Sequence, residues 1–177
     1  MSYYDKVGTY YDKDAVDFEQ RYHENPALQR IRQSFRQHTK SYEQTTVLEV
    51  GFGPGFDLVH FAEQFPQRKF YGIDISAEMV RLTQEKIDRM GLKNAWVANG
   101  SVEDIKVLFP EVQFDMIYVF FGALNTVNDL EGAFADLRAV LSSGGRMVLT
   151  FVNKYYIAGT LIELAKLKPK FAFARWK

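Results

Sequence analysis

The sequence contains no cysteine and has no excess of charge of either sign, because 22 lysines and arginines balance 22 aspartates and glutamates in 177 residues. The lack of cysteine excludes disulfides, thiolate zinc sites and cysteine nucleophiles. The balanced charge creates no overall field that would attract nucleic acid or anionic lipid. No charge-free apolar run is long enough to span a bilayer, and the first residues lack the basic-then-apolar layout of a signal peptide. We therefore expect a cytoplasmic protein that binds no nucleic acid and makes no membrane contact.

Histidine is also scarce, and no group of residues stands out as a metal site or a nucleophilic centre. His23, His38 and His60 are far apart in the sequence and lack the spacing of metal ligands. No serine, histidine and aspartate arrangement is evident either. The sequence therefore predicts no metal site, and it identifies no catalytic residue.

Residues 1–45 are expected to form a lid and a helix that precede the main domain. Residues 1–24 are polar and rich in tyrosine. Asn25 is a typical helix N-cap and Pro26 suits the first helical position, so a helix is predicted to begin there. Leu28, Ile31 and Phe35 share one apolar face of this helix. The other face carries basic residues and no acid, namely Arg30, Arg32, Arg36 and Lys40.

Residues 46–153 alternate between apolar strands and helices, a pattern typical of a parallel α/β sheet. The expected strands cover residues 47–50, 70–73, 95–98, 114–121 and 146–152, with a turn at 142–145 before the last one. The stretch 114–121 is nearly all apolar, as expected for a strand that is buried on both faces. We predict right-handed crossovers, the strand order 3-2-1-4-5, and a ligand site at the carboxyl ends of the strands.

A glycine-rich turn at residues 51–55, Gly-Phe-Gly-Pro-Gly, follows the first strand and indicates a nucleotide-type pocket. Glycine tolerates positive φ and has no side chain, so the backbone of this turn can approach a ligand closely. The helix that follows begins with free N–H groups. A dinucleotide fingerprint would place its third glycine at position 56. Phe56 stands there instead, which argues against a nicotinamide-dependent oxidoreductase.

Five segments resemble the class I S-adenosylmethionine-dependent methyltransferases, and they occur in that family's order. The segments are Leu48–Gly55 (LEVGFGPG), Tyr71–Ser76, Gly100–Asp104, Phe114–Ile117 and Leu141–Arg146, within about 60% of the chain. The resemblance implies a three-layer Rossmann-like methyltransferase fold, a mostly parallel sheet with helices on both faces. It also implies S-adenosylmethionine as the cofactor and methyl transfer as the reaction.

The resemblance assigns the methionine and ribose contacts to individual residues. Asp74 ends the second strand, where its carboxylate would accept hydrogen bonds from both ribose hydroxyls. Glu49 would face the methionine ammonium, directly or through water, or it would accept from the N–H groups of its own loop. Gly51, Gly53 and Gly55 would lie beneath the methionine end.

The adenine side and the lid complete the expected cofactor site. Ile75 and Val102 would enclose the adenine, while Ser101 would either accept from its amine or cap a short helix. Tyr11 would belong to a lid over the methionine end, where an aromatic ring can contact a sulfonium, or it would only pack on the surface. Phe120 follows the fourth strand and would border both cofactor and substrate.

The loop after the fourth strand lacks the Asn/Asp-Pro-Pro-Tyr/Phe motif of family members that methylate amide or base nitrogens. Residues 120–125 are Phe-Phe-Gly-Ala-Leu-Asn instead. We therefore expect a small-molecule acceptor and an in-line transfer in which alignment supplies most of the rate. A non-catalytic cofactor-binding or interaction domain is the alternative.

The chain stops soon after the fifth strand, whereas folds of this kind usually close with two more strands. Residues 154–177 are expected to be the start of a truncated substrate-binding region, or else the sheet ends early. The fifth strand would then be an open apolar edge, which invites pairing with another chain. This predicts self-association through that edge or through the apolar tail.

Overall fold

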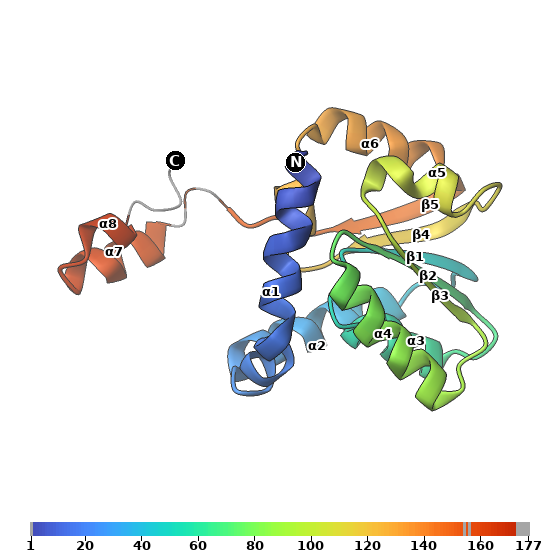
Figure 1. Ribbon diagram of the computed structural model, residues 1–177, viewed down its shortest axis with the longest axis horizontal. Helices are drawn as coiled ribbons and strands as arrows, with labels where there is room; N and C mark the ends of the chain where they lie inside the picture. Colours follow the sequence, from blue (N-terminus) through green and yellow to red (C-terminus); the bar gives the residue numbers. More distant parts are fainter. Residues whose placement is uncertain (1, 154, 156, 173–177) are drawn as a thin grey trace.

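The computed structural model describes residues 2–153, 155 and 157–172, and its centre is a five-stranded parallel sheet (Figure 1). The strands are β1 (Thr46–Val50), β2 (Lys69–Asp74), β3 (Ala95–Asn99), β4 (Phe114–Val119) and β5 (Leu141–Leu149). Their order is β3-β2-β1-β4-β5, which confirms the predicted order. The order in which the strands are added to the sheet therefore reverses between β1 and β4, and a ligand site is expected at the carboxyl ends of these strands.

Helices cover both faces of the sheet, so the three-layer Rossmann-like prediction is confirmed. In Figure 1, α3 (Phe56–Gln64) and α4 (Ala77–Met90) lie on one face, and α5 (Ile105–Leu108) and α6 (Leu130–Ala139) lie on the other. Because side chains alternate along a strand, β1 feeds both cores. Leu48 packs with Ile105 and Leu137 of one layer, whereas Val47 belongs to the core of the other layer, with Phe61.

The bounds of β5 differ from the prediction, because residues 142–145 belong to the strand. The register of the β4–β5 pairing shifts here. Phe114 lies opposite Leu141, whereas Met116, two residues further along β4, lies opposite Arg146, five residues further along β5. The intervening residues form an irregularity in which Gly144 has a φ of 76°. A break in register depends on the partner strand, so the sequence of this segment alone resembles a turn. The strand also ends at Leu149, three residues earlier than predicted.

Residues 3–23 form a long helix, α1 (Tyr3–His23), that the sequence analysis did not predict. Ser2 caps it, because its hydroxyl accepts from the Asp5 N–H and the Asp5 carboxylate accepts from the Ser2 N–H. Figure 1 shows α1 crossing the molecule beside the ends of the strands. Gly8 permits this approach, because a Cβ there would lie 2.9 Å from the carbonyl oxygen of Ile75.

The second helix, α2 (Pro26–Lys40), begins as predicted with Asn25 as its N-cap, but its packed face is different. Arg32 is only 7% exposed, whereas Ile31 is 43% exposed. Ile31 of the predicted apolar face is thus exposed, and Arg32 of the basic face is buried. The reason is Asp57, a fully buried carboxylate on α3 that pairs with both Arg32 and Arg36. Charged groups are buried when they find such partners.

After β5 the chain forms two short helices, α7 (Ile157–Ala165) and α8 (Pro169–Ala172), which stand away from the sheet in Figure 1. Many of their large apolar side chains are exposed, among them Ile157, Leu161, Ile162, Leu167 and Phe171. Residues 173–177 of the expected C-terminal segment lie outside the described residues. None of the helices in the described part is both long and apolar enough to cross a membrane.

We propose that the chain self-associates through the outer edge of β5 or through this apolar surface. Within the described residues β5 pairs with β4 alone, and an open edge with nearby apolar side chains favours pairing between chains. Light scattering over a concentration series should therefore show a mass that rises above that of one chain. A mass that stays at one chain up to high concentration would contradict the proposal.

Candidate functional site

A cavity of about 270 Å³ lies at the carboxyl ends of the strands, with α1 along one side of it. Its walls come from the turns that follow β1, β2, β3 and β4. Most of the residues expected to contact the cofactor line it: Tyr11, Gly51, Gly53, Asp74, Ile75, Ser101, Val102 and Phe120. The fold thus brings together positions that are more than a hundred residues apart in the sequence.

Asp74 ends β2 and holds the glycine turn in place. Its Oδ2 accepts from the Gly53 N–H at 2.8 Å, and its Oδ1 accepts from the Ser76 N–H at 2.9 Å. A carboxylate has about four acceptor sites, so capacity remains for two hydroxyl donors from a ligand. Burial raises the pKa of Asp74 to about 6, although the two N–H donors oppose this shift. The carboxylate is therefore predominantly ionised at pH 7. Asp74 is 7% exposed, at the wall of the cavity.

The three glycines of the turn all have positive φ, but they serve different purposes. Gly51 and Gly53, with φ of 71° and 56°, line the cavity. Gly55 does not line it, and it forms the N-cap of α3 with a φ of 77°. A Cβ on Gly55 would lie 2.5 Å from the side chain of Thr83, so this glycine permits α3 and α4 to pack closely.

The part of the cavity wall that follows β2 and β3 is mostly apolar, with one hydroxyl from Ser101. Ile75 follows β2, and Val102 begins a short 3-10 helix (Val102–Asp104) after β3. The Asp104 carboxylate accepts from both the N–H and the hydroxyl of Ser101, so the helix-cap alternative is present in the structure. The lone pairs of the Ser101 hydroxyl are still available to accept from a ligand amine.

One face of α1 covers the cavity, and several of its side chains were not foreseen as site residues. Tyr4, Val7, Tyr11 and Phe18 line the cavity at the i, i+3, i+7 and i+14 positions of the helix. This spacing is the signal that could have identified them. The Tyr4 hydroxyl donates at 2.8 Å to Glu103, in the short 3-10 helix after β3.

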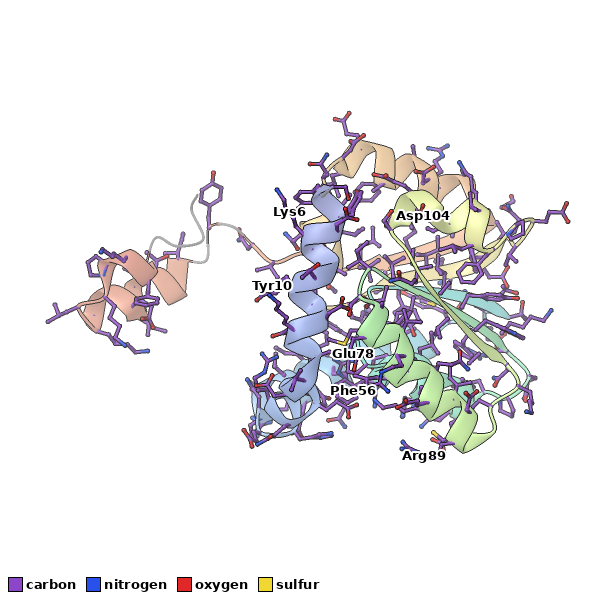
Figure 2. All side chains as sticks on the ribbon, viewed as in Figure 1. Lys6, Tyr10, Phe56, Glu78, Arg89 and Asp104 are labelled. Atoms are coloured by element: carbon purple, nitrogen blue, oxygen red, sulfur yellow. The ribbon has the colours of Figure 1, made fainter. Side chains whose placement is uncertain are left out.

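Asp12 fixes the middle of α1 to the rest of the domain. Its carboxylate accepts from the Ser76 hydroxyl at 2.6 Å and from the Glu78 N–H at 3.1 Å, at the start of α4. Figure 2 shows Glu78 on α4, beside α1. Because Asp12 also satisfies a backbone donor at the N-terminus of α4, it holds α1 over the cavity as a fixed cover.

Glu49 lines a second, adjoining cavity of about 170 Å³. Its carboxyl accepts from the Tyr118 hydroxyl at 2.8 Å, and not from the N–H groups of its own loop. Burial, with a further contribution from Asp57, raises the pKa of Glu49 well above its usual range. Burial likewise raises the pKa of Tyr118 well above its usual range.

The loop after β4 forms a further part of the cavity wall and lies beside the glycine turn, because a Cβ on Gly51 would clash with Ala123. Phe120 is buried, and Phe121 has a φ of 55°, so β4 ends at Val119 and the chain turns sharply. Asn125 exchanges two hydrogen bonds with the backbone of Val152, which ties this loop to the segment after β5. Within the described residues no group of three or more histidines, cysteines, aspartates or glutamates is placed to hold a metal ion.

A parallel α/β fold with a glycine turn after β1 and an aspartate at the end of β2 is typical of nucleotide-binding domains. Comparison with known proteins narrows this class. Residues 47–145 match the family model described as "Methyltransferase domain". The chain therefore belongs to the S-adenosylmethionine-dependent methyltransferases of class I, and S-adenosylmethionine is the cofactor of that family.

Curated relatives share this domain but differ in what they methylate. The chain is 33% identical over 137 residues to the malonyl-[acyl-carrier protein] O-methyltransferase 1 of Ilyobacter polytropus, covering 76% of the chain and 48% of that protein. It is 35% identical over 80 residues to a tRNA (guanine-N(7)-)-methyltransferase of Edwardsiella ictaluri, covering 45% and 34%. The chain thus spans half or less of the length of these relatives.

Solved structures show the same fold. A SAM-dependent methyltransferase from Aquifex aeolicus is 27% identical, with a TM-score of 0.55, and the match covers 62% of this chain and 57% of that one. The DhpI–SAH complex has a TM-score of 0.66 at 20% identity, and the match covers 84% and 69%. The second likeness shows the fold alone.

Asp74→Ala should weaken the binding of S-adenosylhomocysteine about 10- to 150-fold at pH 8. A hydrogen bond to a charged group contributes about 1.5–3 kcal/mol. The affinity of the wild type should also fall as the pH drops below about 6, by roughly tenfold at pH 5, because the proton on Asp74 must leave before the carboxylate accepts both hydroxyls. Calorimetry between pH 5 and 8 measures both effects.

Asp74→Asn should bind less tightly than the wild type but lose the part of the pH dependence that comes from this carboxyl. The pH dependence of fold stability that comes from Asp74 has the opposite sign to that of ligand affinity. Because the pKa of Asp74 is raised in the folded state, its protonated form stabilises the fold at low pH, and this contribution is lost as the pH rises through about 6. An unchanged affinity in both variants would show that the ribose is held elsewhere.

Proposed function

We propose that this chain is the cofactor-binding domain of an enzyme that transfers a methyl group from S-adenosylmethionine to a small molecule. The observation that carries the proposal is the cavity beside α1, where Asp74, the glycine turn and the Ile75–Val102 slot meet. Asp74 would accept from the ribose, and Ile75 and Val102 would enclose the adenine. Gly51 and Gly53 would lie against the methionine end, while Gly55 supports the turn from outside the cavity.

The position of α1 supports a small acceptor. This helix is held over the cavity by Asp12 and by the Tyr4–Glu103 hydrogen bond, so a folded macromolecule could reach the site only if α1 moved away. The match to the malonyl-[acyl-carrier protein] O-methyltransferase is in keeping with a small methylated group. The match to the tRNA methyltransferase covers 34% of that relative. It therefore supports the shared domain and does not identify the methyl acceptor.

S-Adenosylmethionine, when bound, would supply a methyl group already activated on its sulfonium for in-line transfer to the acceptor. The residues of this chain would bind and align the reactants. Phe120 and Phe121 would border the reacting groups and keep water from them. Alignment in a dry pocket supplies much of the rate of such a reaction.

A mass-shift screen tests the proposal. Pools of small metabolites, and separately tRNA, are incubated with the chain and S-adenosylmethionine. We expect a small molecule to gain one methyl group while tRNA does not. Methylation of tRNA alone would overturn the small-molecule proposal. Cofactor binding without any methyl transfer would support the alternative of a non-catalytic cofactor-binding domain.

A further inference from the structure

The second cavity adjoins the first and shares part of its wall. Gly51, Gly53 and Phe120 line both cavities. A ligand whose adenosine fills the slot near Ile75 would therefore extend its other end across the glycine turn into the second cavity. Four charged side chains line that cavity, namely Glu49 at the end of β1, Asp57 on α3, Arg32 on α2 and Arg21 on α1.

Arg32 is held rigidly at this place. Its guanidinium carbon lies 4.7 Å, 4.9 Å and 4.5 Å from the ring centres of Tyr22, Phe56 and Phe121. Its Nη1 donates to the Asp57 carboxylate. Figure 2 shows Phe56 near the meeting point of α1, α2 and α4. A guanidinium enclosed in this way is already oriented, which lowers the entropy cost of binding a ligand.

The hydrogen-bonding capacity of Arg32 is incompletely used. Its Nε is buried and has no hydrogen-bond partner among the described residues. A buried donor without a partner is costly, and native proteins rarely leave one. Neither neighbouring carboxylate accepts from this Nε: Asp57 accepts from Arg32 Nη1 and from Arg36 Nε, and Glu49 accepts from the Tyr118 hydroxyl.

We propose that Arg32 binds the carboxylate of the amino-acid end of S-adenosylmethionine. This inference rests on the proposed function, because it requires the adenosine to bind in the first cavity. An arginine is suited to a carboxylate, since its planar donors match the two oxygens. Glu49, on the same cavity, would face the ammonium group. Arg21 and Asp57 also line this cavity, but Arg21 is paired with Asp14 and Asp17, and Asp57 is shared by Arg32 and Arg36. Arg32 and Glu49 would therefore meet the two charges of the amino acid.

The test compares two nucleosides on the wild type and on the Arg32→Gln variant by calorimetry. S-Adenosylhomocysteine has the amino-acid end, and 5′-methylthioadenosine lacks it. Arg32→Gln should weaken S-adenosylhomocysteine binding about 10- to 150-fold, as expected for a lost charged hydrogen bond, and leave 5′-methylthioadenosine binding unchanged. An equal loss for both nucleosides, or no loss for either, would overturn the inference.

Arg36→Gln is the matched control. Arg36 also pairs with Asp57, but it does not line the second cavity. The ratio of the two affinities should therefore stay near the wild-type ratio in this variant, and a loss as selective as that of Arg32→Gln would contradict the assignment.

A measurement on the wild type alone covers the case in which Arg32→Gln fails to fold. The decarboxylated analogue of S-adenosylhomocysteine, which keeps the ammonium, should bind about 10-fold or more weakly than the parent compound. Equal affinities would overturn the inference. If the wild type binds 5′-methylthioadenosine, the proposed cofactor site stands even when the Arg32 assignment fails, and if it binds no adenosine compound, both fail.

Discussion

Gly53→Val is expected to abolish detectable binding of S-adenosylhomocysteine while leaving the far-UV circular dichroism spectrum close to that of the wild type. Gly53 lines both cavities, and a Cβ built on it meets no protein atom within 4 Å. The valine side chain would therefore enter the space reserved for the ligand without clashing with the fold. The valine would also have to adopt the φ of 56° that Gly53 has, and this strain should lower the stability of the fold by about 1–3 kcal/mol.

The strain and the blockage can be separated with a matched control. Gly91 ends α4 with a φ of 64°, and a Cβ there also meets no atom within 4 Å, but the residue lines neither cavity. Gly91→Val should show a similar loss of thermal stability and bind S-adenosylhomocysteine like the wild type. If Gly53→Val binds the ligand normally, the glycine turn does not contact it.

Asp57→Asn is expected to cause the largest loss of stability, about 3–5 kcal/mol in the free energy of unfolding. Asp57 is fully buried and accepts from both Arg32 and Arg36. Removal of its charge leaves two largely buried guanidinium groups without a full counter-charge, and broken buried ion pairs typically cost this much. For a domain of this size the melting temperature should fall by roughly 6–20 °C. Thermal and urea denaturation monitored by circular dichroism measure the effect.

Glu78→Gln is the control for the Asp57 variant. Glu78 pairs with Arg81 on the exposed surface of α4, where solvent screens the attraction, so the pair contributes little to stability. The melting temperature of the Glu78→Gln variant should therefore stay close to that of the wild type. A melting temperature of Asp57→Asn equally close to that of the wild type would show that the buried charges are dispensable for stability.

The parallel sheet and the glycine turn could be predicted because their signals are local. Each buried strand is an apolar run, and the turn needs glycine at positions where φ is positive, as at Gly51 and Gly53. The extra residues at the start of β5 could not be read in the same way. Their place in the strand depends on how Phe114 and Met116 pair with it, and the sequence of 142–145 alone resembles a turn.

The helical segments before the sheet were harder to predict for a different reason. The many charged residues of α1 obscure its apolar stripe, although Ser2 and Asp5 give a capping signal. In α2 the buried position of Arg32 follows from Asp57, which lies 25 residues further along the chain. Long-range charge pairing of this kind leaves no periodic pattern in the sequence, so the second cavity and its arginine were not foreseen.

Titration calorimetry of the wild-type chain with S-adenosylhomocysteine and with NAD tests the central conclusion most directly. The family membership, together with the cavity that Asp74 lines at the end of β2, points to S-adenosylmethionine as the ligand. S-Adenosylhomocysteine should bind at a single site, and NAD should give no heat of binding. Binding of NAD without binding of S-adenosylhomocysteine would contradict the assignment of this cavity to S-adenosylmethionine.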